Sequence, residues 1–551
     1  MLHKVLLSLI FCFVSVLTKA QLSGSLESNS ALYIDDAKIK LEQTDAEQRF
    51  RSNNYLRLDY KLKKITAGVQ IESYEPKALL NYAPSLKKTN IGTYYLNYRN
   101  DTIGLDVTIG HFYTQFGNGL VFRSWEDRQL GIANSINGAM IKYNPINAIK
   151  VTTLYGKQRN GLGNDFSNST IAAVNTDIEL STLFKAKKIK YSAGLSYVNR
   201  KETDMPFANL KKSTYLTSFR ADISANGFSA DLEYVFKSKD ALVEFNNVRP
   251  EFQFDGEAYL LNFSYAKNGF GITGNFRRLE NFGMYSERKL AGNVYNQALI
   301  NYVPALTKQY DYSLTNIYVY AAQPNLSFDP DRNKAGEIGG QVDVFFKLKK
   351  DTKLGGKYGT NVSINFSYWG GLKGRYDALQ RKYAAEGFGF GQKYYSDFSI
   401  EIRKKWNKKW SSVITYVNQY YNARYVEEAI GEVNANTFVF DNTHKLKKST
   451  SLRWEVQHQW AKGRFNNWAA ATAEFNFNSQ WSVFATDLYN YGNDDVNNRL
   501  HFYNVGTIFN KGAYRFQASY GRQRGGLICV GGVCRFVPQS AGVNASINIS
   551  F

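Results

Sequence analysis

Apolar and polar residues alternate along most of this chain, in stretches of about ten positions that end at turn-forming residues. In one such stretch, 55–62, one face carries Leu56, Leu58, Tyr60 and Leu62. The other face carries Arg57, Asp59 and Lys61. The alternation recurs at 338–348, 394–405 and 451–460. A period of two predicts β-strands that have one apolar face and one wet face.

The length of these stretches favours strands that cross a lipid bilayer. Strands in soluble proteins average about five or six residues, whereas a transmembrane β-strand needs about ten, with aromatic residues near its ends. Short turns alternate with long connections, among them 111–136, 238–253, 279–336, 370–393 and 522–540. We therefore predict an all-β fold, a closed antiparallel transmembrane β-barrel of about 24 strands (range about 22 to 26) with inward-folded loops. Closure leaves no sheet edge unpaired in the membrane.

The two ends of the chain predict export to the bacterial outer membrane. Lys4, an apolar run over 5–17 and Ala20 before Gln21 predict a cleaved signal peptide over residues 1–20, which leaves 21–551 as a single barrel. The last strand alternates and ends in the aromatic Phe551. It resembles the terminal strand that barrel-assembly machinery recognises, so we expect that machinery as a partner. The expected surroundings are outer-membrane lipids and lipopolysaccharide.

Composition removes several other classes of protein. Aromatic residues make up 15% of the 551 positions, which is too many for a disordered chain. Beyond the first twenty residues we find no apolar run of the roughly 20 residues that a membrane-spanning helix needs. The formal net charge of +21 is compatible with nucleic-acid binding. We expect no nucleic acid as a partner, however, because an exported barrel does not meet it.

Two segments and the start of the mature chain resemble a known family. Gln21 as the first mature residue and the stretches 110–143 and 520–538 are similar to an uncharacterised family of outer-membrane β-barrels of the Bacteroidota. The resemblance implies the location and the porin-like fold. It implies no established activity and no functional residue.

The connection 111–136 carries the strongest candidate for a pore constriction. Arg123, Glu126, Asp127 and Arg128 lie close together in it. In porin-like pores, opposed basic and acidic side chains create a transverse field that selects polar solutes. The alternative is an exposed loop whose charges are only solvated. The connection 279–336 is long enough to be a second lumen element or a lid.

Basic and sulfur-containing residues near the long connections suggest further roles. Arg159, Arg522 and Arg524 follow two predicted strand ends, so we place them at the outer rim, facing the lumen or lipopolysaccharide phosphates. Cys529 and Cys534 flank a glycine-containing loop, and in an exported protein this spacing predicts a local disulfide.

One segment has the spacing of a possible calcium loop. Asp329, Asp331, Asn333 and Glu337 offer oxygen ligands at alternating positions, although Lys334 stands where such loops need glycine. A polar turn without metal is the alternative, and we expect no other cofactor.

The sequence predicts a transport protein and not an enzyme. The mature chain has four histidines, at positions 111, 444, 458 and 501, and none lies in a nucleophile motif. We expect a porin-like channel or transporter for a polar solute. The alternative is a non-conducting barrel that serves as a scaffold or partner in outer-membrane assembly, secretion or surface attachment, with envelope partners that the sequence does not identify.

Overall fold

The computed structural model describes residues 21–41, 49–79, 86–203, 210–244, 247–290, 293, 297–327, 333–377, 379 and 382–551. The predicted signal peptide, residues 1–20, lies outside this range. Within it, no helix is long and apolar enough to cross a membrane.

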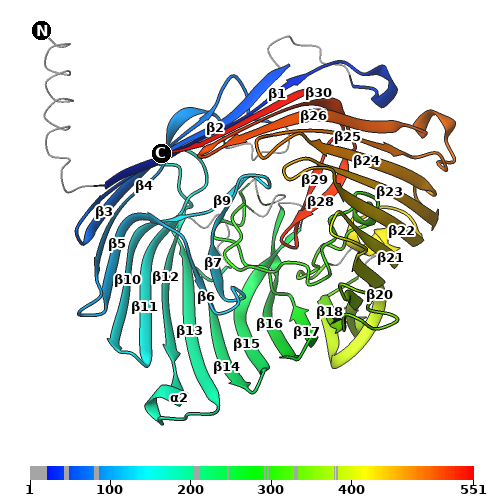
Figure 1. Ribbon diagram of the computed structural model, residues 1–551. Helices are drawn as coiled ribbons and strands as arrows, with labels where there is room; N and C mark the ends of the chain where they lie inside the picture. The colour runs from blue at the N-terminus through cyan, green and yellow to red at the C-terminus, as the bar shows by residue number, and fades with distance from the viewer. Residues whose placement is uncertain are drawn as a thin grey trace, which may run out of the picture.

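Twenty-four strands form one closed antiparallel barrel (Figure 1), which confirms the predicted fold and strand number. Each strand pairs with its neighbours along the ring, and the last strand closes on the first through pairs from Ser25↔Ser550 to Tyr33↔Gly542. The barrel strands are β1 (Gln21–Tyr33), β2 (Phe50–Leu62), β3 (Ile65–Tyr74), β4 (Lys88–Asn100), β5 (Leu105–Phe112), β10 (Ile136–Ile146), β11 (Ile149–Gln158), β12 (Ser169–Ile178), β13 (Lys190–Glu202), β14 (Ser213–Ala225), β15 (Phe228–Glu244), β16 (Asn247–Lys267), β17 (Phe270–Glu280), β18 (Gly336–Leu348), β19 (Thr360–Asp377), β20 (Lys382–Lys405), β21 (Trp410–Asn422), β22 (Glu432–Lys445), β23 (Ser451–Lys462), β24 (Trp468–Asn476), β25 (Trp481–Tyr489), β26 (His501–Lys511), β27 (Tyr514–Gln523) and β30 (Ser540–Ser550).

The alternation in the sequence separates an outer from an inner face. In β14, Phe219 is 54% exposed while its neighbours Ser218 and Arg220 are buried. Large apolar side chains are exposed in the same way on strands around the ring, for example Leu96, Ile109 and Leu195. This apolar outer face is what a barrel in a lipid bilayer requires.

Connections at one end of the barrel, the short-turn end, are mostly tight. β2 joins β3 through Lys63 and Lys64 alone, and β14 joins β15 through Asn226 and Gly227. Two connections at this end are longer than predicted: 179–189, which contains helix α2 (Leu180–Leu183), and 349–359. The opposite end carries the long connections, with the short helices η1 (Ala37–Ile39), α3 (Ala423–Val426) and η5 (Val496–Asn498).

Two segments predicted as connections are strands. The ranges 238–253 and 370–393 lie mostly in the hairpins β15–β16 and β19–β20. In β19–β20 the extension carries polar outward residues such as the ion pair Lys373–Glu386. Exposed Phe388 and Phe390 lie in the same extension. Because polar and apolar residues are mixed there while the backbone ladder continues, hydropathy alone underestimated the strand length.

Three long connections fold into the barrel instead of away from it (Figure 1): 113–135, 281–335 and 524–539. We call their described residues the lumen plug. They contain β6 (Thr114–Phe116), β7 (Phe122–Ser124), β8 (Glu126–Asp127), β9 (Ile132–Ala133), η4 (Leu314–Asn316), β28 (Gly526–Val530) and β29 (Val533–Val537).

The main buried clusters lie between the plug and the wall. Phe116 and Phe122 of the plug pack in one cluster with Val198, Leu216 and Val235 of the wall. In a second cluster, Leu314, Tyr318 and Tyr320 of the plug pack with wall residues that include Trp369, Val433 and Trp468. Burying these side chains provides the hydrophobic driving force that holds the plug inside the barrel.

Candidate functional site: the plugged lumen

Connection 113–135 spans the lumen from one wall to another. Asn118 donates from its side-chain amide to Asp231 and Glu233 of β15, both at 3.0 Å. Arg128 of the same connection pairs with Glu27 of β1 at 2.5 Å. In the ring, β15 is the eleventh strand counted from β1, so the two contacts lie on nearly opposite walls.

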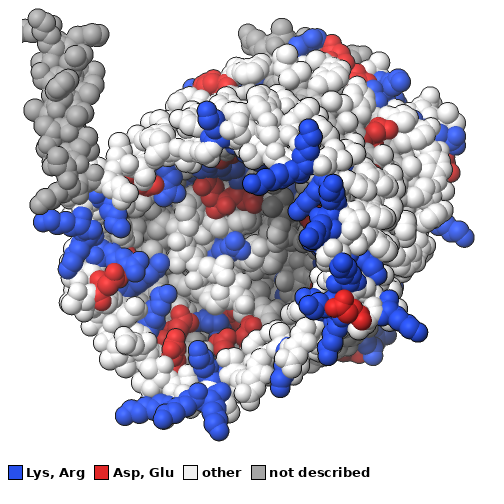
Figure 2. Space-filling model, in the orientation of Figure 1, with Lys and Arg blue, Asp and Glu red and all other residues white. Residues whose placement is uncertain are grey.

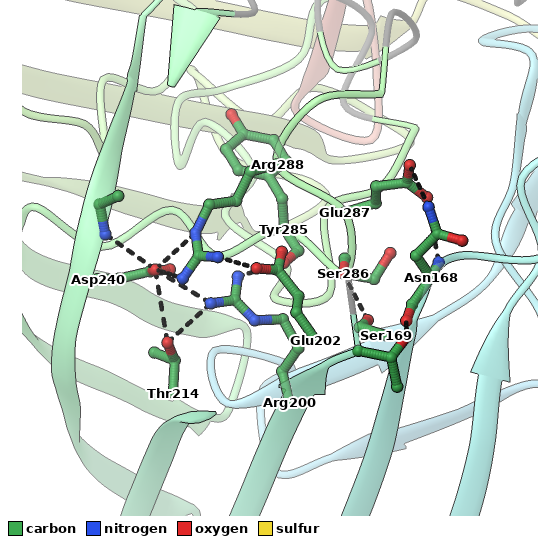
Figure 3. Close-up of polar contacts among 12 residues, drawn as sticks. Asn168, Ser169, Arg200, Glu202, Thr214, Asp240, Tyr285, Ser286, Glu287 and Arg288 are labelled. Atoms are coloured by element: carbon green, nitrogen blue, oxygen red, sulfur yellow. Dashed lines mark hydrogen bonds and ion pairs between the residues drawn. The ribbon is translucent and has the colours of Figure 1, made fainter. Parts of the chain in front are cut away.

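Connection 281–335 spans the lumen in a second direction. Tyr310 donates from its hydroxyl to Asp397 of β20 at 2.8 Å. The amide of Leu314 donates to Gln457 of β23, and Gln459 donates to the carbonyl of Leu314, both at 2.9 Å. The segment Tyr285–Arg288 contacts the other side of the ring, at β12, β13 and β15 (Figure 3).

Asp240 of β15 is the centre of that second contact (Figure 3). Its carboxylate accepts from Arg200 of β13 at 3.0 Å and from Nε of the plug residue Arg288 at 2.9 Å. Arg288 also pairs with Glu202 of β13, and Arg200 donates to the carbonyl oxygen of Tyr285 at 2.7 Å. Arg200 and Arg288 are 0% and 4% exposed. Because a guanidinium stays charged, removing its carboxylate partner would leave an unpaired buried charge, which strongly destabilises this contact.

The same plug segment is fixed on its other side by neutral and acidic groups. The Ser169 hydroxyl donates to the carbonyl oxygen of Ser286, and Glu287 accepts from Asn160 at 2.9 Å and from the amide of Asn168 at 3.2 Å. Three of the four consecutive plug residues therefore bond wall strands, and Glu287 bonds the connection between β11 and β12.

Arg159, predicted at the rim, is buried inside the barrel. It makes a bidentate pair with Glu72 of β3 at 2.8 and 2.7 Å and donates to the carbonyl oxygen of Gly161 at 2.6 Å. Both charged side chains are at most 1% exposed. Arg159 directly follows the end of β11, and of its two predicted orientations the geometry favours the inward one, in which its guanidinium is enclosed and already paired with a carboxylate.

The other two predicted rim residues also point to partners within the chain. Arg522 pairs with Asp36 at 2.6 Å, and both side chains are largely buried. Arg524 donates to the carbonyl oxygen of Asn316 in the plug at 3.2 Å. These contacts direct the two guanidiniums to protein groups, so lipopolysaccharide binding by them stays a prediction without support from the geometry.

The four predicted constriction residues have three separate roles. Arg123 lies against Trp125 and Tyr302, with its guanidinium carbon 4.6 and 3.7 Å from the ring centroids. Asp127 accepts from the amide of Leu130 at 2.8 Å and so closes a local turn. Glu126 and Arg128 pair with each other at 3.2 Å.

These four side chains consequently do not oppose one another across an aperture. The Glu126–Arg128 pair lies beside β1 and β3, where Gln70 bonds both members at 3.1 Å. Charges that neutralise each other on one wall create little transverse field. The structural role of the Glu126–Arg128 pair is to attach connection 113–135 to the wall.

The third plug connection is a disulfide-closed hairpin, β28–β29. The predicted bond between Cys529 and Cys534 is present. The hairpin contacts both other plug connections: the amide of Ala305 donates to Gly532 at 2.7 Å, the Tyr302 hydroxyl donates to Gly531 at 3.0 Å, and Arg535 donates to Leu130. It therefore joins the two spanning connections to each other.

The predicted calcium ligands are only partly within the described residues. Asp329 and Asp331 lie outside them. Glu337 is buried in an ion pair with Arg277 at 2.5 Å and accepts from the Tyr320 hydroxyl at 2.5 Å. Burial and the neighbouring Glu337 charge raise the pKa of Tyr320 well above its usual range, so this tyrosine stays a donor. In the described part of the chain no group of three or more His, Cys, Asp or Glu side chains could hold a metal ion.

The short-turn end opens into a hollow (Figure 2). Lys and Arg surround its rim, and Asp and Glu lie on its inner wall. One cavity of about 300 Å³ lies in this wall, lined by residues that include Arg57, Tyr95, Asn97, Asp106 and Lys142. Its charges are bridged by hydrogen bonds: Arg57 to Asp59 at 2.7 Å, Tyr95 to Asp59 at 2.7 Å and Asn97 to Asp106 at 2.6 Å.

The residues that anchor the plug were missed by sequence reasoning. Arg200, Glu202 and Asp240 are buried charged residues near the long-loop ends of β13 and β15. A charged residue at such a position was the available signal, but its partner lies on another strand or in the plug. The residues next to it on its own strand do not reveal that pairing.

The fold and the lumen together define a transmembrane β-barrel closed by interior loops. Residues 1–551 match a family of unknown function, DUF6029, and the chain belongs to that family. The comparison with curated proteins gave no significant match.

Several solved outer-membrane proteins are similar to this chain at low identity. The siderophore receptor PirA from Pseudomonas aeruginosa is 8% identical with a TM-score of 0.40, over 96% of this chain and 80% of that one. The BenF-like porin from Pseudomonas fluorescens Pf-5 is 9% identical with a TM-score of 0.37, over 97% and 99% of the two chains. The copper transporter OprC is 7% identical with a TM-score of 0.40, over 97% and 80%. At these TM-scores the similarities carry no argument about function.

Proposed function

We propose that this protein is a non-enzymatic outer-membrane transporter that passes a polar solute through its lumen and is closed at rest by the lumen plug. The observation that carries the proposal is the combination of a polar hollow at one end with a plug at the other. A transporter needs both a wet path that exchanges hydrogen bonds with the solute and a barrier that stops leakage.

The inner wall between the mouth and the plug supplies the wet path. The cavity of about 300 Å³ is lined by cationic, anionic and amide groups side by side, including Arg57, Asp106 and Lys142. A polar solute that enters exchanges its bonds to water for bonds to such groups. This mixture of charges favours a neutral or zwitterionic polar solute over a strongly charged one.

The hairpin β28–β29 is the part of the plug that we propose to move. It joins the adjacent strands β27 and β30, and it bonds the other two connections through Tyr302, Ala305 and Leu130. Connections 113–135 and 281–335 each bond two distant walls, so their displacement breaks more contacts.

Single-channel recording in planar bilayers tests the proposal. The full-length protein should be closed most of the time. A variant in which 526–537 is replaced by a short Gly-Ser linker should show stable conducting steps. The matched control, Cys529→Ser with Cys534→Ser, keeps every other hairpin residue and should stay closed. If the linker variant is folded and silent, the hairpin is not the gate and the transport proposal loses its support.

A second candidate function is a sealed barrel that acts as a scaffold in outer-membrane assembly, secretion or surface attachment. The observation that favours it is the buried pairing of plug and wall around Asp240, which resembles the fixed interior of a rigid protein more than a gate. Silence of all plug variants, together with reproducible co-purification of envelope proteins from detergent extracts, would favour the scaffold.

The proposed location follows from the apolar outer face and the polar interior of the barrel. We propose the outer membrane of a Bacteroidota cell, reached through cleavage of the signal peptide over 1–20 and insertion by the barrel-assembly machinery. Fractionation of the membranes and sequencing of the mature N-terminus at Gln21 test both statements.

A further inference from the structure

Four aromatic rings form a continuous stack on the outer face of strands β20 to β23, at the short-turn end. The ring centroids of Trp406 and Trp410 are 5.3 Å apart, those of Trp410 and His444 5.7 Å, and those of His444 and Trp454 6.5 Å. The interplanar angles are 24°, 12° and 9°, so the rings lie nearly parallel.

The register shows that this stack faces away from the lumen. In β21, Gln419 donates to plug carbonyl oxygens, so the odd-numbered side chains of this strand face the lumen. Trp410 has an even number and therefore lies on the outer face. In β23 the odd positions Gln457 and Gln459 contact the plug, and Trp454 is on the opposite face. Trp406 is 43% exposed.

Five lysines lie in the two turns next to the stack and on the outward end of β20. They are Lys404, Lys408, Lys409, Lys447 and Lys448. The segments 402–412 and 442–454 contain no Asp or Glu. Lys404 lies over the Trp406 ring, with Nζ 5.0 Å from the centroid. We call the four rings and five lysines the Trp–Lys sector.

A like-charged cluster without local acids requires negative charge from outside the chain. Above the stack the same outer face carries Tyr416, Phe438 and Val456, which are 38%, 41% and 45% exposed. Moving toward the short-turn end, the surface therefore passes from apolar side chains through aromatic rings to lysines. A phospholipid has the same order: acyl chains, glycerol backbone and phosphate.

We propose that the Trp–Lys sector is a binding site for the headgroup of an anionic phospholipid in the leaflet that surrounds the short-turn end. The rings set the depth of the glycerol region, and the turn lysines bind the phosphate. This inference does not depend on whether the barrel conducts.

Native mass spectrometry of the full chain tests the site, after reconstitution in nanodiscs that contain equal amounts of phosphatidylglycerol and phosphatidylethanolamine. The test variant replaces Lys408, Lys409, Lys447 and Lys448 by Gln. The matched control replaces Lys185, Lys187, Lys188 and Lys190 by Gln, which removes the same charge from the turn around α2, where there is no Trp.

The native chain should retain phosphatidylglycerol in preference to phosphatidylethanolamine. The test variant should lose at least about tenfold in that retention and the control less than about twofold, because only the test variant removes lysines that lie beside the aromatic rings. Equal retention of the two lipids by the native chain overturns the proposal. An unchanged test variant, or an equal loss in both variants, also overturns it.

A measurement on the native chain covers the case in which the test variant does not fold. Acetylation of lysines in nanodiscs of each lipid should show protection of Lys408, Lys409, Lys447 and Lys448 by phosphatidylglycerol only. The lysines around α2 should react equally in both lipids. Equal reaction of the two sets in phosphatidylglycerol refutes the site.

Discussion

Replacing Asp240 by Asn should loosen the lumen plug without touching the outer face of the barrel. The substitution keeps the size of the side chain and removes the charge that Arg200 and Arg288 share. Both guanidiniums are nearly inaccessible to water; Arg288 then keeps its pair with Glu202, and Arg200 keeps its hydrogen bonds to Thr214 and to the Tyr285 carbonyl oxygen. Breaking a buried ion pair from one side costs about 3 to 5 kcal/mol.

That cost acts on the closed state, in which Arg288 is packed against the wall. Because about 1.4 kcal/mol corresponds to a factor of ten, the equilibrium should shift toward a displaced plug by about two to nearly four orders of magnitude. Open probability in planar bilayers measures this shift directly. Protease access to 281–335 in detergent gives a second reading.

Asp101→Asn is the matched control, since it removes the same charge from an ion pair outside the lumen. Asp101 and Arg99 are 79% and 64% exposed, and a pair of this kind contributes little. Both variants should retain the heat-sensitive gel mobility of a folded barrel. If Asp240→Asn is folded and matches Asp101→Asn in open probability and protease access, the charges around Asp240 do not hold the plug.

Further predictions concern the connection after β1 and the barrel seam. Burial raises the pKa of Asp36, but the hydrogen bond and charge of Arg522 outweigh it and hold this pKa below its ordinary value. The pair therefore stabilises the fold above the ordinary Asp pKa of about 4, and the stabilisation is lost as the pH falls through the lowered pKa. Asp36→Asn should melt below the native chain at pH 7, and the two melting temperatures should converge once the pH has fallen below the lowered pKa of Asp36; a constant difference would contradict the argument. At the seam, a Cβ on Gly24 would lie 2.5 Å from the Phe551 ring. Gly24→Val should therefore displace the terminal ring and lower the yield of folded barrel in the outer membrane, and a yield equal to that of the native chain would contradict this argument.

The strand number and the closed barrel were predictable from the sequence because strand alternation is a local property. In β5, for example, Ile109 is exposed and Thr108 is buried, as neighbours on opposite faces must be. The same local rule failed at 238–253 and 370–393. There exposed polar residues such as Lys373 and Glu386 interrupt the outer apolar face although Leu242 and Leu372 are buried, so hydropathy does not mark strands that backbone hydrogen bonds continue to form.

The roles of the charged residues were less predictable. Arg159 and Arg522 were correctly noticed as unusual arginines near strand ends, yet Glu72 and Asp36, their partners, lie 87 and 486 positions away. The local disulfide between Cys529 and Cys534 was predictable because its partners are five positions apart. Sequence distance thus separates the pairing that local spacing predicted from the pairings that it did not.

The order of apolar and polar residues by itself determined that this chain is a bilayer-facing barrel, since each strand must present one face to lipid and one to the interior. Only the tertiary structure decided what fills that interior. A connection becomes a plug when its side chains find partners on walls ten strands apart, as Asn118 and Arg128 do. Such contacts depend on the curvature of the closed ring, which no stretch of sequence contains.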